Sequence, residues 1–216
     1  MSSDREEQQA GRSYRMRRRA GHVDATRQRI VEAAVVLHGS VGPAATTVMG
    51  IAELAGVTRA TVYRHFPDDD TLFTACSAHW IAGQHPPDPT SWAAVVDPEQ
   101  RLRLGLTELY RFYREGEPML SRVYRDLAHL PDLRRADIAA RDGMIRAVLL
   151  APYDAASRGG PVLTAIVGHV TSFWTWRSMC VDGGLDNDQA IELFTALIAL
   201  VATPTQRRRS ARKDRS

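Results

Sequence analysis

The sequence predicts an all-α protein, and two observations lead to this fold class. Apolar residues recur every three or four positions along most of the chain, as Ile30, Ala34 and Leu37 do near its start. Glycines and prolines interrupt this pattern at intervals, and no run of alternating apolar and polar residues predicts a strand. We therefore expect helices joined by loops, in a chain of 216 residues that is long enough to bury a hydrophobic core.

Four helices are predicted in the first third of the chain, and each has residues that favour its ends. They cover residues 25–37, 48–55, 59–66 and 68–81. Thr47 and Thr58 can cap the second and third helices, because a threonine oxygen accepts from the free N–H groups of a first turn. Gly56 ends the second helix and Pro67 ends the third. The aspartates at 68–70 suit the start of the fourth helix, where the helix dipole favours negative charge.

The rest of the chain is helical again after a proline-rich stretch at 83–98, which we interpret as a loop or a domain boundary. One apolar stripe runs from Leu102 to Tyr113. Pro118 is predicted to start a second helix and Pro131 a third, because proline is favoured in a first turn and disfavoured further along. A Gly-Gly-Pro segment then precedes two final helices, at 161–181 and 187–203.

Charge divides the chain into an acidic body and two basic tails. Of the net charge of +3, residues 1–22 carry +3 and residues 205–216 carry +5, which leaves −5 for residues 23–204. Neither tail has helical periodicity, so we expect both to be disordered in the free protein. Basic tails of this kind contact a polyanion or stay solvated, and charge alone does not separate these two possibilities.

The most informative segment is 47–66, where two short predicted helices meet at Gly56. In a helix-turn-helix, a glycine here allows the tight turn, the small Ala52 lets the helices approach, and Val62 fixes the second helix on the first. The second helix of such a motif can lie in the major groove of DNA with its first residues at the base edges. Helical hairpins of this size also occur in proteins that bind no DNA, so the spacing alone does not decide.

The exposed residues of the predicted 59–66 helix suit contact with DNA. Its capped N-terminus favours a phosphate, and Arg59 can donate two hydrogen bonds to guanine. Ala60 permits close approach, and the methyl group of Thr61 can meet a thymine methyl. The candidate DNA-contacting residues of this helix and its cap are Thr58, Arg59, Ala60, Thr61, Tyr63, Arg64 and His65.

Residues 26–76 resemble the tetracycline-repressor (TetR) family of bacterial transcription regulators. The most specific part of the resemblance is the run GVTRATVYRHF at 56–66. The resemblance implies a three-helix DNA-binding head on an all-helical body. It also implies that Thr47 contacts DNA together with the residues of the 59–66 helix. On this basis we expect a disordered basic arm (1–22), a helix-turn-helix DNA-binding domain (23–80), a helical ligand-binding and dimerisation domain (81–204) and a disordered basic tail (205–216).

Two positions of the predicted DNA-binding domain depart from the family pattern. His38 stands where the family often has an aromatic residue, and Asp69 stands where it frequently has a lysine. An aspartate repels phosphate, and residues 23–80 carry only four arginines against six acidic residues. Affinity for phosphate must then come partly from elsewhere, and the arm at 1–22 is the predicted source.

The last two predicted helices are apolar on nearly all faces, which is typical of helices buried on more than one side. They can be internal core helices or part of a dimer interface, and the resemblance favours a four-helix interface in a homodimer. A two-fold dimer places two recognition helices about 34 Å apart on a near-palindromic DNA site. The candidate interface residues are Val162, Ile166, Val170, Ile191, Phe194, Ile198 and Val201.

Large aromatic and amphipathic residues gather in the middle and late helices. Residues of this kind at helical spacing belong more often to a core than to a pocket, but together they are consistent with an apolar cavity that has a few polar groups. The resemblance implies a small-molecule inducer in this cavity, coupled to DNA binding. The candidate lining residues are Tyr110, Tyr113, Arg122, Tyr124, His129, His169, Phe173, Trp174 and Trp176.

Other classes of function find little support. Cys76 and Cys180 form no disulfide framework and match no metal spacing, so we expect a reducing cytoplasm. No apolar run is long enough to cross a membrane, and no motif for nucleotide, metal or nucleophilic chemistry is present. We therefore expect no cofactor, no metal and no catalytic residue.

The predicted function is that of a DNA-binding transcriptional repressor, a homodimer that a small molecule releases from a near-palindromic operator. Two alternatives remain open. The first is a transcriptional activator, or a regulator that responds to no small molecule. The second is an enzyme that uses the helical body.

Overall fold

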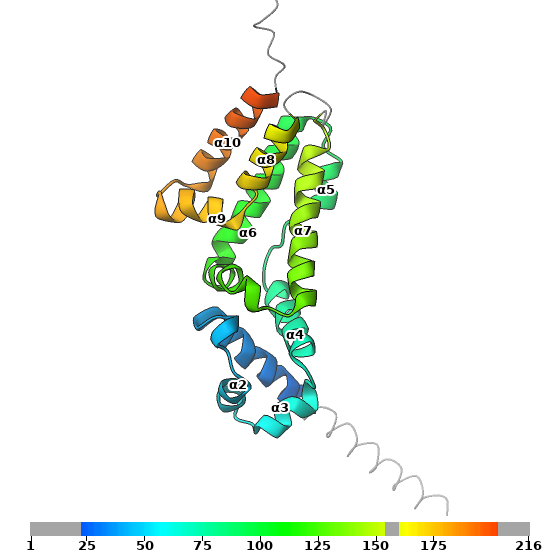
Figure 1. Ribbon diagram of the computed structural model, residues 1–216, viewed down its shortest axis with the longest axis vertical. Coiled ribbons are helices and arrows are strands. Elements are labelled where there is room, and N and C mark those ends of the chain that lie inside the picture. Colours follow the sequence, from blue (N-terminus) through cyan, green and yellow to red (C-terminus); the bar gives the residue numbers. More distant parts are fainter. Residues whose placement is uncertain (1–22, 154–159, 203–216) are drawn as a thin grey trace, which may run out of the picture. The chain divides into compact units, whose positions relative to one another are not determined.

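The computed structural model describes residues 23–153 and 160–202, and all regular structure in this part of the chain is helical, as predicted (Figure 1). The predictions for the arm at 1–22 and the tail at 205–216 lie outside the described residues. Residues 23–40 form the first described helix. The elements that follow are η1 (Pro43–Ala45), α2 (Val48–Ala55), α3 (Arg59–His65), α4 (Asp69–Ala82), α5 (Pro89–Ala93), α6 (Pro98–Arg125), η2 (Leu127–His129), α7 (Asp132–Leu150), α8 (Gly160–Val170), α9 (Phe173–Trp176), η3 (Arg177–Asp182) and α10 (Asn187–Ala202).

The chain forms two compact units, which we call the head and the body. The head contains the residues up to Gly83 together with Ser121–Arg134, and the body contains Gln84–Leu120 and the residues from Arg135 onward. α6 therefore begins in the body, whereas its last turn belongs to the head.

The core of the head is built by the 23–40 helix, α2, α3 and α4. Small buried side chains such as Ala34 and Ala52 allow these helices to pack closely. The guanidinium carbon of Arg27 lies 4.7 Å from the centre of the Phe66 ring, so a cation–π contact joins the first helix to the end of α3. The buried core residues are Ile30, Val31, Ala33, Ala34, Ile51, Ala52, Ala55, Val62, Phe66, Leu72 and Cys76.

The prediction that Pro118 starts a helix was wrong, because α6 runs without interruption from Pro98 to Arg125 and contains Pro118. A proline inside a helix removes one backbone donor and costs about 3 kcal/mol. The apolar face of α6 continues across it, however, with Tyr113, Gly116 and Leu120 all buried. The burial of this face outweighs the local cost.

The predicted helix at 161–181 is also wrong, because α8 ends at Val170 and a new helical segment starts at Phe173. The hydroxyl of Tyr110 donates to the Val170 carbonyl at 2.7 Å, and that of Tyr113 donates to the Thr171 carbonyl at 2.8 Å. Two side chains of α6 thus satisfy carbonyl groups that a continuous helix would have used itself. The second segment then widens into the π-helical turn η3.

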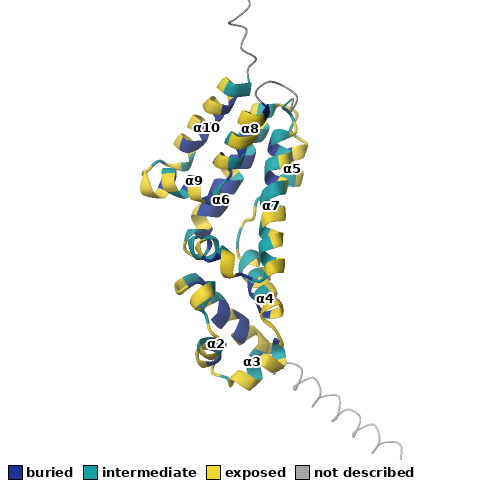
Figure 2. Ribbon diagram, in the orientation of Figure 1, coloured by how far each residue is buried: buried dark blue, intermediate teal, exposed yellow. Residues whose placement is uncertain are grey.

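The proline-rich stretch at 83–98, predicted as a loop or boundary, contains the short helix α5. Asp88 caps it by accepting from the Thr90 N–H at 3.0 Å. Trp92 is fully buried and donates its indole N–H to Glu108 of α6 at 3.0 Å. Gly105 of α6 makes room for this tryptophan, since a Cβ there would lie 3.2 Å from Trp92 Cε3 and 2.7 Å from Leu149 Cδ2. Figure 2 shows buried residues in α6.

Candidate nucleic-acid interface

α2 and α3 form a helix-turn-helix whose turn depends on Gly56. The residue has φ 64° and ψ 41°, the left-handed conformation that glycine adopts without strain. Its N–H donates to carbonyls of the last turn of α2, and the N–H of Val57 donates to the Ala52 carbonyl at 2.9 Å. The last turn of α2 is therefore closed by the residues of the turn itself, which confirms the predicted role of Gly56.

The side chain of Val62 packs α3 against the rest of the head. Val62 is only 1% exposed, and it belongs to the same buried cluster as Ile51, Ala52 and Ala55 of α2. α3 has only seven residues, too few for a helix that is stable alone, so its position depends on this contact. The other residues of α3 are left free to face outward.

Both helices of the motif have the threonine caps that the sequence predicts. Thr47 Oγ1 accepts from the Gly50 N–H at 3.0 Å, and Thr58 Oγ1 accepts from the Thr61 N–H at 3.2 Å. The hydroxyls of Thr58 and Thr61 also form a hydrogen bond of 3.0 Å with each other. The first turn of α3 is thus held in one conformation before any partner binds.

The predicted DNA-contacting residues come together on the outer surface of this motif. Six of them are exposed, namely Thr47, Thr58, Arg59, Ala60, Tyr63 and Arg64, and the remaining two, Thr61 and His65, are half-buried. Tyr63 is 47% exposed. This surface, defined by the eight residues, is called the α3 face below.

His65 adds a donor or acceptor to the α3 face and little positive charge. Partial burial lowers its pKa below the ordinary value of 6.5, and the charges of Arg64 and Arg27 lower it further. The imidazole is therefore neutral at physiological pH. The positive charge of this surface comes from Arg59 and Arg64 alone.

Residues at the end of α6, which the sequence analysis did not identify, hold the loop that leads into α2. Asp126 accepts from the Ala44 N–H at 3.1 Å and from Nε of Arg125 at 2.7 Å. Arg125 also donates to the Val41 carbonyl at 2.9 Å, and Nε of Arg122 donates to the Ser40 carbonyl at 2.7 Å. No periodicity or motif signals these contacts, since they join positions more than 80 residues apart.

The nine residues predicted to line a ligand cavity do not form one group. Tyr110, Tyr113, Phe173 and Trp176 are packed together in the core of the body, with ring centres of Tyr113 and Phe173 5.3 Å apart. His169 and Trp174 of the body are exposed. The other three, Arg122, Tyr124 and His129, belong to the head.

The seven residues predicted for the dimer interface differ in exposure. Val170, Ile191, Phe194 and Ile198 are buried within their own chain, whereas Ile166 and Val201 are half-buried and Val162 is exposed. α10 instead exposes Leu193, Leu197 and Leu200, which recur at intervals of four and three residues. These leucines form an apolar stripe that lies about 100° around the helix axis from Phe194, Ile198 and Val201.

The described residues contain no candidate membrane span and no candidate metal site. None of the helices in residues 23–153 and 160–202 is long and apolar enough to cross a membrane. Within the same ranges, no three histidine, cysteine or acidic residues are grouped so that they could hold a metal ion.

Comparisons with known proteins agree with this geometry. Residues 30–76 match the family model of bacterial regulatory proteins, tetR family, which confirms the resemblance found at 26–76. Comparison with curated proteins gives no significant match. Among solved structures, the chain is similar to the TetR-family regulator PfmR from Thermus thermophilus, with 23% identity over 83% of this chain and 100% of that chain, and a TM-score of 0.51. It is also similar to a protein from Rhodococcus sp. described as a TetR-family transcriptional regulator, with 16% identity over 82% of this chain and 99% of that chain, and a TM-score of 0.50.

Proposed function

We propose that this chain, whose residues 30–76 match the family model of bacterial regulatory proteins, tetR family, represses transcription as a homodimer that a small molecule releases from DNA. The DNA-binding part rests on one observation, the geometry of α3. Val62 fixes this helix to α2, Thr58 caps it, and the α3 face is exposed. Such a helix can enter the major groove with its first residues at the base edges.

The residues of the α3 face have different roles in this proposal. Arg59 reads a guanine through two hydrogen bonds, while Ala60 and Thr61 make close apolar contacts with bases. Thr47, Tyr63 and His65 donate to phosphates and fix the register of the helix on the duplex. The DNA-binding domain then corresponds to residues 23–80, and the ligand-binding and dimerisation domain to residues 81–204.

The test compares Arg59→Ala with Arg111→Ala, since both arginines are exposed and only Arg59 belongs to the α3 face. Fluorescence anisotropy with DNA from beside the gene, and with scrambled DNA, measures affinity and selectivity. We expect Arg59→Ala to cost about 1–3 kcal/mol and to reduce the selectivity. Arg111→Ala should bind like the wild type. Equal losses in the two variants would contradict the assignment of α3 as the reading helix.

The apolar stripe of α10 supports a homodimer. Leu193, Leu197 and Leu200 are 48%, 39% and 77% exposed, and Val162 of the neighbouring helix α8 is 54% exposed. Exposed apolar residues in such a row are typical of a surface that a partner covers. A second copy buries these four residues in a two-fold interface made by α8 and α10 of each subunit. On α8 this interface keeps the predicted Val162, whereas on α10 it is rotated around the helix from the predicted residues.

Leu197→Glu tests the dimer, with Met144→Glu as its control. Both residues are exposed and apolar, and both belong to the body. A glutamate on a packed apolar surface leaves a charge without water, so we expect Leu197→Glu to shift the protein to a monomer in analytical ultracentrifugation. Met144→Glu should sediment like the wild type. A dimer that survives Leu197→Glu would place the interface elsewhere.

The inducer and the cellular location are further parts of the proposal. The family resemblance supports a small apolar or aromatic inducer in the body, and the lack of a cysteine framework supports a reducing cytoplasm. The tyrosine hydroxyls of Tyr110 and Tyr113 already donate to backbone carbonyls. An inducer that reaches this cluster must therefore contact ring faces, or break a hydrogen bond that ends α8.

A further inference from the structure

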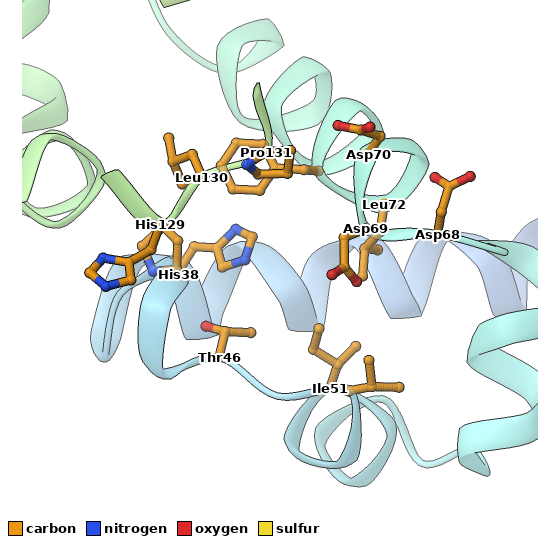
Figure 3. Close-up of a pocket in the computed structure, with 13 residues that line it drawn as sticks. His38, Thr46, Ile51, Asp68, Asp69, Asp70, Leu72, His129, Leu130 and Pro131 are labelled. Carbon is orange, nitrogen blue, oxygen red and sulfur yellow. The ribbon is translucent and has the colours of Figure 1, made fainter. Parts of the chain in front are cut away.

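A pocket in the head lies between the 23–40 helix, the start of α2, the start of α4 and the segment after η2 (Figure 3). Its volume is about 390 Å³, which is in the range of small-molecule sites. One part of its wall is apolar and includes Val48, Ile51, Leu72, Phe73 and Leu130. The other part is polar and is made by His38, Thr46, His129 and the aspartates at 68–70. None of the eight residues of the α3 face lines it, so the pocket is distinct from the proposed DNA interface.

His38 brings a buried ring nitrogen to this pocket. The residue is 8% exposed, and its Nδ1 lies 3.6 Å from Sγ of Cys76. The Cys76 thiol stays protonated, because burial raises its pKa to about 12, and it lies 3.4 Å from the Phe73 carbonyl. When the thiol donates to that carbonyl, Nδ1 of His38 keeps its hydrogen and Nε2 presents a lone pair. Among the described residues Nε2 has no hydrogen-bond partner.

The imidazole of His38 carries no charge at physiological pH. Burial lowers its pKa from 6.5 to about 4. The ring can accept a hydrogen bond from a cation without repelling it.

Asp68, Asp69 and Asp70 all line the pocket, and they differ in the direction of their carboxylates. In Figure 3 the Asp69 carboxylate extends into the space between the His38 ring and Ile51, whereas the carboxylates of Asp68 and Asp70 extend away from that space. Asp68 also accepts from the Thr71 N–H at 2.7 Å as the cap of α4. Within residues 23–153 and 160–202, the Asp69 carboxylate has neither a hydrogen bond nor an ion pair.

We propose that this pocket binds an organic ammonium ion that carries an apolar group. The ammonium group donates to the Asp69 carboxylate and to Nε2 of His38. The apolar group lies against the side chains of Leu72, Phe73 and Leu130. One buried acceptor, one carboxylate and a group of apolar side chains thus line the same pocket, which is the combination that fixes an amphipathic cation in place.

Other occupants fit this pocket less well. A metal ion requires several ligands, and the described part of the chain groups no three residues that could supply them. An anion is repelled by the three aspartates at 68–70. A neutral apolar molecule would take water from the Asp69 carboxylate without offering a hydrogen bond in return.

The experiment is calorimetric titration of the full chain with phenethylammonium chloride, and with 2-phenylethanol as a neutral molecule of similar shape. We expect saturable binding of the ammonium ion, and binding of the alcohol at least about tenfold weaker, because a charged hydrogen bond is lost. No DNA is present, so the result does not depend on the proposed repressor function. Equal affinity for the two probes, or no saturable binding of the ammonium ion, would overturn the proposal.

Asp69→Asn and Asp70→Asn form a matched pair, since each removes one negative charge from adjacent positions of the same helix. Asp69→Asn should weaken binding of phenethylammonium about tenfold or more, and Asp70→Asn should change it less than about twofold. Equal effects would mean that only the general negative charge of the head attracts the probe. A titration with MgCl₂ tests a metal ion as the occupant. If Mg²⁺ binds strongly, Asp69→Asn abolishes this binding, and the ammonium ion does not bind, the pocket is a metal site instead.

The role of His38 is measured separately, because this residue is buried and its replacement can affect folding. Nitrogen-15 NMR of the imidazole ring should show a shift of Nε2 when the ammonium probe saturates the wild-type protein. An unchanged Nε2 signal at saturation would remove His38 from the site and overturn the proposed geometry. Wild-type protein suffices for this measurement, so it does not rely on a stable His38 variant.

Discussion

Asp126 holds the loop that leads into the helix-turn-helix, and Asp126→Asn measures how much this contact contributes to the stability of the head. The carboxylate is 6% exposed and accepts from the Ala44 N–H at 3.1 Å and from Nε and Nη2 of Arg125 at 2.7 and 3.0 Å. Asparagine keeps the size and one acceptor, but it places a neutral amide before the guanidinium. The change therefore removes charge while leaving the packing nearly intact.

The expected loss follows from the exposure of the two partners. A hydrogen bond to a charged group contributes about 1.5–3 kcal/mol when it is protected from water. The Arg125 side chain is 54% exposed, so solvent screens its share to less than about 1 kcal/mol. The bond to Ala44 is weakened rather than lost. We expect the free energy of unfolding to fall by about 1–2 kcal/mol at neutral pH.

The pH dependence of the same variant gives an independent check. The hydrogen bond from Arg125, aided by that from Ala44, lowers the pKa of Asp126 below its ordinary value. The carboxylate therefore stabilises the folded state above the unfolded-state pKa of about 3.9, and this contribution is lost as the pH falls through the folded-state pKa. The stability difference between wild type and Asp126→Asn should narrow in this acidic range.

Urea unfolding at neutral and acidic pH measures these differences, and hydrogen exchange of the Ala44 amide locates them. The exchange rate of this amide should rise about tenfold for each 1.4 kcal/mol that the local structure loses. Glu53→Gln, at an exposed position of α2, is the control for removal of one carboxylate. Unchanged stability and unchanged exchange at Ala44 would refute the view that Asp126 anchors this loop.

Three further predictions concern the DNA-binding unit. Gly56→Ala should lower stability by about 1–2 kcal/mol, because φ is 64° there, and a higher melting temperature would argue against the turn geometry. Tyr63→Phe should weaken DNA binding in anisotropy titrations while the sedimentation of the protein stays unchanged, since it removes only an exposed hydroxyl. Deletion of residues 1–20 should weaken DNA binding and flatten its salt dependence, and equal slopes for the two chains would exclude a role of the arm in phosphate binding.

The sequence predicted the head well because its structure is determined locally. The caps Thr47 and Thr58 act on N–H groups three residues away, and Gly56 closes the helix that precedes it. Helical spacing was enough to identify Val62 as the residue that packs α3 on α2. The contacts of Arg122, Arg125 and Asp126 with the loop before α2 were not predicted, because they join residues that only the folded chain brings together.

The body was predicted less well because the side of each helix that becomes buried depends on which other helices pack against it. α10 is apolar on almost every side, so its sequence does not indicate which residues face α8 and which face outward. The prediction assigned Ile191, Phe194 and Ile198 to the interface, whereas the structure buries these three within the chain. The exposed stripe lies one position away along most of the helix, which corresponds to a rotation of about 100°.

The same dependence on tertiary structure explains the break after α8. The apolar run at 161–181 has the period of one helix, and no glycine or proline predicts an interruption between Val170 and Phe173. The break is stabilised from outside the segment by the hydroxyls of Tyr110 and Tyr113. These two tyrosines were assigned to a ligand cavity from their residue type alone, and their hydrogen bonds show a structural role that the sequence does not reveal.

The two positions at which the head departs from the family pattern acquire a common explanation from the fold. His38 and Asp69 are 31 positions apart in the chain, yet both line the same pocket. Taken singly, an aspartate at the start of α4 only weakens attraction to phosphate, and a histidine at the end of the first helix only replaces an aromatic ring. Together they provide an acceptor and a charge in one pocket that also has apolar side chains in its wall. A cation bound there neutralises a carboxylate of the head, so its binding and the binding of DNA should strengthen each other by the same factor.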